Sequence, residues 1–165
     1  MKKSILLLLL GITISFSGVH AQDWLDFRAE SCLCKAQFPA SPELKQEQKE
    51  GYKSNQAVAE YEGDVFLLDY STFPEPMDKE DGIIFAREAV NAFSETLGAM
   101  VIKEKKYKMN GWEGLATQME IPGEEAIIYY NTVLVRSINY QIVMIGSSED
   151  AKKRGKKFIK SFKLQ

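Results

Sequence analysis

Two cysteines separated by a single residue are the sharpest chemical feature of the sequence. Cys32 and Cys34 lie in the segment from Ser31 to Phe38, whose alternate residues are apolar, and this period predicts a strand. On a regular strand the two Cα atoms would lie about 6.6 Å apart, near the upper limit of about 6.8 Å for a disulfide. A bridge would therefore require a local distortion of the strand.

The cysteine pair has three interpretations. A bridged and distorted pair would suit thiol–disulfide exchange. Two thiolates would suit a soft metal ion, with methionines as the remaining soft ligands. The simplest interpretation is that Cys32 and Cys34 are small hydrophobic side chains buried in the core.

Four aromatic residues on predicted strands are candidates for lining a binding groove. Trp112, Tyr129, Tyr130 and Tyr140 each combine a large apolar surface with a polar atom, which suits ligand binding. Aromatic residues on strands also form core or cross-strand pairs, so both roles stay open. The sequence contains no Gly-rich phosphate loop, nucleophile elbow or paired metal motif, and we expect no cofactor.

The single histidine, His20, falls in an N-terminal segment with the pattern of a secretory signal peptide. Lys2 and Lys3 precede an apolar run that includes Leu6–Leu10, and Val19–Ala21 offers a cleavage site. We therefore expect residues 1–21 to be a cleaved signal peptide and residues 22–165 to be a single domain without histidine. This loss removes His-based acid–base catalysis, Ser–His and Cys–His nucleophile pairs, and His metal ligands.

Export would place the mature protein in the periplasm or outside the cell. No later stretch approaches the roughly 20 apolar residues of a transmembrane helix, so we expect no stable membrane anchor after cleavage. Charge is unevenly placed: residues 151–165 carry six lysines and one arginine without an acid, whereas residues 22–150 carry 12 basic and 23 acidic residues. We interpret these lysines as the solvated face of a helix, and we expect no nucleic-acid partner because exported proteins rarely meet one.

Two helices are expected. Ala86, Val90, Phe93 and Leu97 recur at helical spacing, and Gly98 suits the C-terminal cap of that helix. A second helix is expected from about residue 149 to residue 159.

The remaining pattern predicts a mainly antiparallel sheet. Its expected strands are 31–38, 45–50, 56–62, 65–73, 101–109, 112–121, 125–136 and 140–146. The polar strand 45–50 should lie at an edge, and the apolar strand 125–136 should lie in the centre. Because Asn110-Gly111 and similar turns join consecutive strands, the expected class is α/β of the α+β type, a mainly antiparallel sheet covered by helices.

This order of elements resembles the PsbP-like family, which includes the extrinsic photosystem II subunit, the Ran-binding Mog protein and small exported DcrB-like bacterial proteins. The resemblance rests on Phe38-Pro39, the helix from Ile83 to Leu97, the turn segment 110–114 (NGWEG) and the terminal segment 158–163 (FIKSFK). It covers nearly the whole mature chain, and we place the sequence in the exported bacterial branch. The resemblance implies an α/β/α sandwich that mostly serves binding and assembly, and it implies no particular reaction.

These features predict an exported, non-catalytic binding or assembly module. Its partner would be a protein, an envelope component or a small ligand, held at a sheet edge or in a surface groove. One alternative is a thiol redox or soft-metal protein that uses Cys32 and Cys34. The other is a hydrolase that uses carboxylates alone, which requires two acids about 5–9.5 Å apart across a cleft. On balance we expect the protein not to be an enzyme.

Overall fold

The computed structural model describes residues 24–165, so the predicted signal peptide, residues 1–21, lies outside the described residues. The described part forms ten strands and two helices. In chain order they are β1 (Leu25–Ala29), β2 (Cys34–Phe38), β3 (Glu43–Lys49), β4 (Tyr52–Tyr61), β5 (Asp64–Thr72), α1 (Lys79–Leu97), β6 (Met100–Met109), β7 (Trp112–Glu120), β8 (Ile127–Val135), β9 (Ile138–Gly146), α2 (Ala151–Ser161) and β10 (Lys163–Leu164).

Seven of the strands form one antiparallel sheet in the order β3-β4-β5-β9-β8-β7-β6. The polar strand β3 is exposed at every position and lies at one edge, and the apolar strands β8 and β9 lie in the centre. Both placements were predicted. Asn110 and Gly111 form the turn between β6 and β7 with φ angles of 49° and 82°, as a tight hairpin of this sequence requires.

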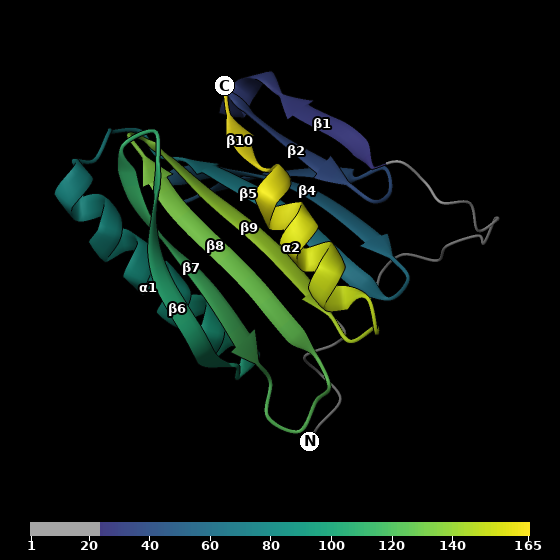
Figure 1. Cartoon of the computed structure of the whole chain (residues 1–165). Helices are drawn as coiled ribbons and strands as arrows, with labels where there is room; N and C mark the ends of the chain where they lie inside the picture. The colour runs from purple at the N-terminus through teal and green to yellow at the C-terminus, as the bar shows by residue number, and fades with distance from the viewer. Residues whose placement is uncertain (1–23) are drawn as a thin grey trace.

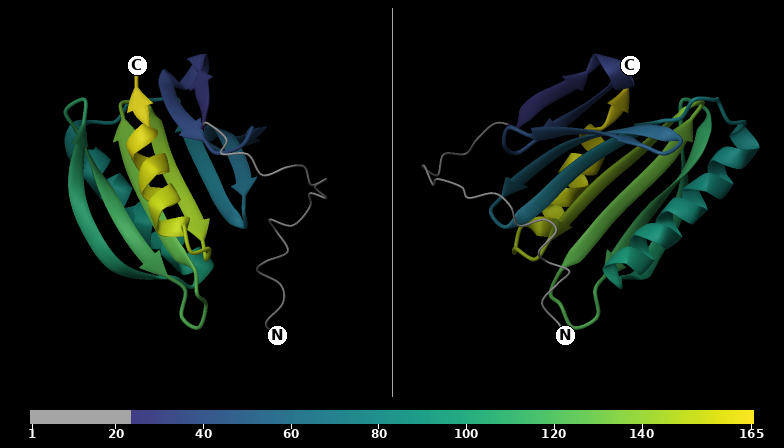
Figure 2. Two further views of the ribbon diagram at one scale, coloured as in Figure 1. Left: turned by 45° about the vertical axis from the view of Figure 1, so that its right-hand side comes forward. Right: turned by 180° about the vertical axis from the view of Figure 1, so that it is seen from behind.

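Each face of this sheet is covered by a different layer. The helix α1 lies on one face, and α2 lies on the other together with a three-stranded sheet of order β1-β2-β10 (Figures 1 and 2). Side chains alternate between the faces along each strand, so that Tyr130 and Val143 pack under α1 whereas Tyr129 and Met144 pack under α2. The expected α+β class and the α/β/α layering are confirmed.

The cysteine pair departs from the expected strand. Residues Glu30–Cys32 form a short 3₁₀ turn, Leu33 adopts a left-handed φ of 50°, and β2 begins only at Cys34. This kink brings the Cα atoms of the two cysteines to 5.2 Å, and their sulfurs form a disulfide. The interpretation as free thiols is therefore wrong, because the chain makes the local distortion that a bridge requires. The burial of both side chains is confirmed at 0% exposure.

The C-terminus and the central sheet both hold this disulfide turn in place. The backbone N–H of Gln165 donates a hydrogen bond of 2.7 Å to the carbonyl of Leu33. The Tyr140 hydroxyl donates one of 2.7 Å to the carbonyl of Cys32. Within residues 24–165, no helix has the length and apolar character needed to cross a membrane.

Candidate anion-binding groove

The four predicted aromatic residues lie in different places. Tyr130 stacks on Phe93 of α1, with ring centroids 4.4 Å apart. Tyr140 points into the opposite core and binds the disulfide turn. Trp112 lies near the start of α1, with the Lys79 ammonium 5.7 Å from its ring centroid. Of the four, only Tyr129 lines either of the two hollows beside α2 in the described part of the chain, so the four do not converge on one site there, and their role in binding stays a prediction.

The groove that contains Tyr129 lies between α2 and the β6 side of the large sheet. It has a volume of about 380 Å³. Its wall combines residues of β6, β7, β8 and α2: Lys103, Lys105, Ala116, Thr117, Gln118, Tyr129, Asn131, Lys156, Ile159 and Lys160. The groove exists because α2 packs on β9, β8 and β2 but leaves the β6 side of the sheet bare.

Four ammonium groups surround this groove. Lys103 and Lys105 come from the edge strand β6, and Lys156 and Lys160 come from α2. Among residues 24–165 none of the four forms an ion pair with a carboxylate. Like charges gathered around a cleft attract counter-ions and anionic ligands. The side chains of Gln118 and Asn131 add neutral hydrogen-bonding groups to the same wall.

Tyr129 lines the groove, and its hydroxyl oxygen is itself buried. Its side chain is 9% exposed, and its hydroxyl has no hydrogen-bond partner among the described residues. Burial raises the pKa of Tyr129, so the hydroxyl keeps its proton at neutral pH and stays a donor. A buried polar group without a partner is costly.

A glycine in α2 sets the distance between the helix and Tyr129. A Cβ atom added at Gly155 would lie 2.6 Å from Cδ2 of Tyr129 and 3.1 Å from Sδ of Met144. No larger residue fits there without moving the helix or the ring. Gly155 therefore lets α2 approach the sheet and keeps Tyr129 between the two layers.

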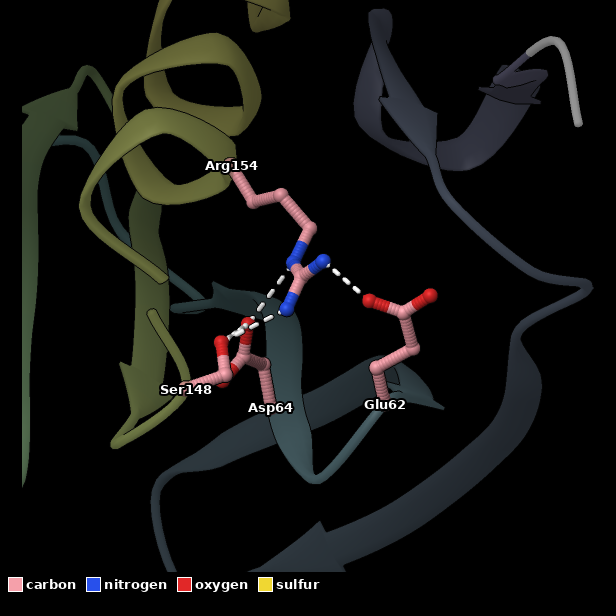
Figure 3. A network of polar contacts seen from close by, with 4 residues as sticks. All are labelled: Glu62, Asp64, Ser148 and Arg154. Carbon is pink, nitrogen blue, oxygen red and sulfur yellow. Dashed lines mark hydrogen bonds and ion pairs between the residues drawn. The ribbon is translucent and has the colours of Figure 1, made fainter. Parts of the chain in front are cut away.

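An ion-pair network fixes the start of α2 on the β4–β5 hairpin (Figure 3). The fully buried carboxylate of Asp64 accepts hydrogen bonds from Nε of Arg154 at 2.8 Å and from the Ser148 hydroxyl at 2.9 Å. Arg154 also pairs with Glu62 and lies over the ring of Tyr61. The network joins residues about 90 positions apart in the chain and so determines where the lysines of α2 stand.

A second hollow lies on the other side of the same lysines. It has a volume of about 480 Å³ and is shallower than the groove. Gln37, Lys153, Lys156, Lys157, Lys160 and Ser161 line it. Because Lys156 and Lys160 line both depressions, the two form one basic surface across α2.

The lysines of this surface were interpreted from the sequence as a solvated helix face without a binding role. The available signal was the charge asymmetry of residues 151–165. That signal could not show that Lys103 and Lys105 face the same groove, because β6 and α2 are more than 40 residues apart in the chain. Of the groove residues, only Tyr129 was proposed in advance as a binding residue, and Lys156 and Lys160 were assigned to a solvated helix face.

The cysteine pair lies away from this groove, in the core below the small sheet. With both sulfurs in the disulfide, no thiolate is available to a metal ion. In the described part of the chain, no cluster of three or more His, Cys, Asp or Glu residues is placed to hold a metal.

No protein-family model matches the sequence, and no curated protein matches it. Among solved structures, the chain is similar to the solution structure of cyanobacterial PsbP (CyanoP) from Synechocystis sp. PCC 6803, with a TM-score of 0.64. The match covers 95% of this chain and 99% of that chain at 11% sequence identity. The fold is PsbP-like. This confirms the fold that the sequence motifs implied, whereas membership of the exported DcrB-like branch stays a prediction.

Proposed function

We propose that this protein is an exported, non-catalytic binding module that holds a negatively charged group of its partner in the groove between α2 and β6. The observation that carries the proposal is the convergence on one cleft of four lysines that form no ion pair within residues 24–165. Carboxylates and phosphates accept charge-assisted hydrogen bonds from ammonium groups. The side-chain amides of Gln118 and Asn131 would contribute neutral donors.

The composition of the groove supports binding rather than catalysis. Its wall contains lysines, amides, a phenol and apolar groups, and no carboxylate, imidazole or thiol among the described residues. A carboxylate-only hydrolase needs two acids across a cleft, and neither depression beside α2 supplies one. Lysines that lie side by side and face an open groove are well suited to counter-charge recognition.

A titration with hexaglutamate tests the proposal. In NMR spectra of the mature protein, we expect the largest shifts at Tyr129, Asn131 and the lysines of the groove. Lys105→Glu and Lys156→Glu should each weaken binding at least 10-fold. Lys152→Glu on the exposed side of α2, outside both depressions, should change it less than threefold.

Equal losses in Lys152→Glu and Lys156→Glu would show attraction to overall charge, and the groove proposal would then be wrong. The salt dependence adds an independent measurement, since the affinity should fall steeply between 50 and 200 mM salt for a site built from exposed ammonium groups. Export is tested separately by the mass of the protein recovered outside the cytoplasm. The mature N-terminus is expected at Gln22.

The disulfide supports a second candidate, a thiol redox function. A bridge between residues only two positions apart closes a very short loop. Against this candidate, both sulfurs are fully buried, and exchange requires an attacking thiolate to reach one of them. If the protein is a redox carrier, glutathione should reduce the bridge in the native state within minutes. Reduction only on unfolding would assign the bridge a structural role.

A further inference from the structure

Among residues 24–165, no strand pairs with the outer side of β6, which forms an edge of the large sheet. It lies at the end of the strand order (Figure 1). Most of its ten residues are exposed. An edge strand of this length presents a row of backbone N–H and C=O groups that another strand can pair with. The groove described above begins directly beside it, because Lys103 and Lys105 belong to both.

The hairpin register shows which backbone groups face outward. Met109 pairs with Trp112 across the two-residue turn Asn110-Gly111, and such a closing pair directs its backbone groups toward the partner strand. Since the direction alternates along an antiparallel strand, Tyr107, Lys105 and Lys103 also face β7. The outward groups therefore belong to Lys108, Lys106 and Glu104.

The charge beside this edge has one dominant sign. The side chains of Lys103 and Lys105 lie on the groove side of the sheet, and those of Lys106 and Lys108 lie on the opposite side. Lysines on an edge strand normally discourage the addition of another strand. The same lysines favour addition when the incoming strand is acidic. The other edge, β3, alternates Glu43, Lys45, Glu47 and Lys49 and offers no such preference.

We infer that β6 accepts an extended acidic segment of a partner protein as an eighth, antiparallel strand whose acidic side chains lie on the groove side. The inference rests on the proposed function, since Lys103 and Lys105 serve both, and it names the partner as an acidic peptide segment. The distance between residues i and i+2 is the same on both strands. Acids at alternate positions of the segment would therefore face Lys103 and Lys105. Backbone pairing with Glu104, Lys106 and Lys108 would supply affinity, and the lysines would supply selectivity.

Three peptides of the same sequence, one unmodified and two N-methylated at different amides, test this geometry. The probe is a capped decapeptide that alternates glutamate and threonine. In the inferred pose, glutamates face the groove and the threonine N–H groups point toward β6, because paired residues share a face. N-methylation of the threonine amides should therefore weaken binding at least 10-fold. N-methylation of the glutamate amides should change it less than threefold.

Amide hydrogen exchange gives a second readout. The unmodified peptide should slow exchange at Lys106 and Lys108 at least 10-fold and leave the amides of β3 unchanged. The inference is overturned if the threonine-methylated peptide binds as tightly as the unmodified one and the amides of β6 exchange at an unchanged rate. If Lys105→Glu still abolishes binding in that case, the groove proposal stands without strand addition.

Other outcomes assign a different partner or remove both proposals. Binding of phosphatidylglycerol vesicles at concentrations where the peptide does not bind would assign the basic surface to a membrane and overturn the inference. Failure of both hexaglutamate and the decapeptide to bind at 1 mM and low salt would overturn the inference and the proposed function together.

Discussion

The two faces of the large sheet differ in how completely their buried polar groups are hydrogen-bonded. On the face under α1, the buried polar groups are paired: the Thr117 hydroxyl donates to the Tyr130 carbonyl at 2.8 Å, and Thr132 donates to Asn139 at 3.0 Å. On the face under α2, three buried polar atoms lack a partner among residues 24–165: the Tyr129 and Tyr107 hydroxyls and one carboxylate oxygen of Asp64.

The different lengths and positions of the helices explain this contrast. The 19-residue helix α1 lies along β7 and β8, whereas the 11-residue helix α2 lies toward β9 and β2. The bare strip of sheet beside α2 becomes the groove, and Tyr129 lines it. Unsatisfied polar groups in native structures often mark functional sites. The proposed groove therefore lies on the face whose buried polar groups are less completely paired.

The largest expected effect concerns the two arginine pairs. Arg154→Met would leave the fully buried Asp64 without its cation and should lower the free energy of unfolding by about 3–5 kcal/mol. Arg87 and Glu104 on the α1 side are both partly exposed, so Arg87→Met should cost about 0–1 kcal/mol. Urea denaturation of both variants measures the difference. Equal losses would show that the Asp64 network does not fix α2.

Tyr140 should make stability sensitive to high pH. Burial raises the pKa of Tyr140 from 10.0 to about 12, so the unfolded chain loses the phenolic proton first as the pH rises. The contribution is fully present below pH 10 and is lost between pH 10 and pH 12, by about 3 kcal/mol. In urea denaturation across this pH range, the free energy of unfolding should fall less for Tyr140→Phe than for the wild type. Equal losses of unfolding free energy in the two proteins would show that water reaches Tyr140 at the centre of the α2 face.

Much of the fold could be predicted because its signals are local. The Asn110-Gly111 turn, the helical spacing from Ala86 to Leu97 and the polar edge strand 43–49 each depend on residues close in sequence. The disulfide turn could not be predicted in the same way. It depends on a left-handed conformation at Leu33, which residues of this type seldom adopt, and on contacts with Tyr140 and Gln165 from the far end of the chain.

The groove could be predicted only in part for the same reason. The pattern identified Tyr129 as an aromatic residue on a strand and Lys156 as part of a helical lysine face. It did not show that they meet, because that depends on the pairing of β5 with β9 and on the return of β6 to the outer edge. Long-range strand order is set by the packing of whole elements, and no short motif encodes it.

Two buried helix glycines provide the next test. Gly155→Ala would place a methyl group 2.6 Å from the Tyr129 ring and should cost about 1–3 kcal/mol through overpacking. At Gly82 in α1 the nearest atom would be 3.5 Å away, so Gly82→Ala should gain up to about 1 kcal/mol in helix propensity. In thermal unfolding, Gly155→Ala should lower the melting temperature and Gly82→Ala should raise it. A stabilised Gly155→Ala would show that α2 can withdraw from the sheet.

The smallest effect should come from two adjacent tyrosines on opposite faces. The Tyr130 hydroxyl donates to Oε1 of Gln141 at 3.0 Å, so Tyr130→Phe should lower the free energy of unfolding by about 1 kcal/mol. Tyr129→Phe removes a buried hydroxyl that has no partner within residues 24–165 and should raise the free energy of unfolding by up to about 1 kcal/mol, with hexaglutamate binding changed less than threefold. If Tyr129→Phe lowers stability as Tyr130→Phe does, the hydroxyl has a structural partner, and Tyr129 is as fully hydrogen-bonded as the buried polar groups of the α1 face.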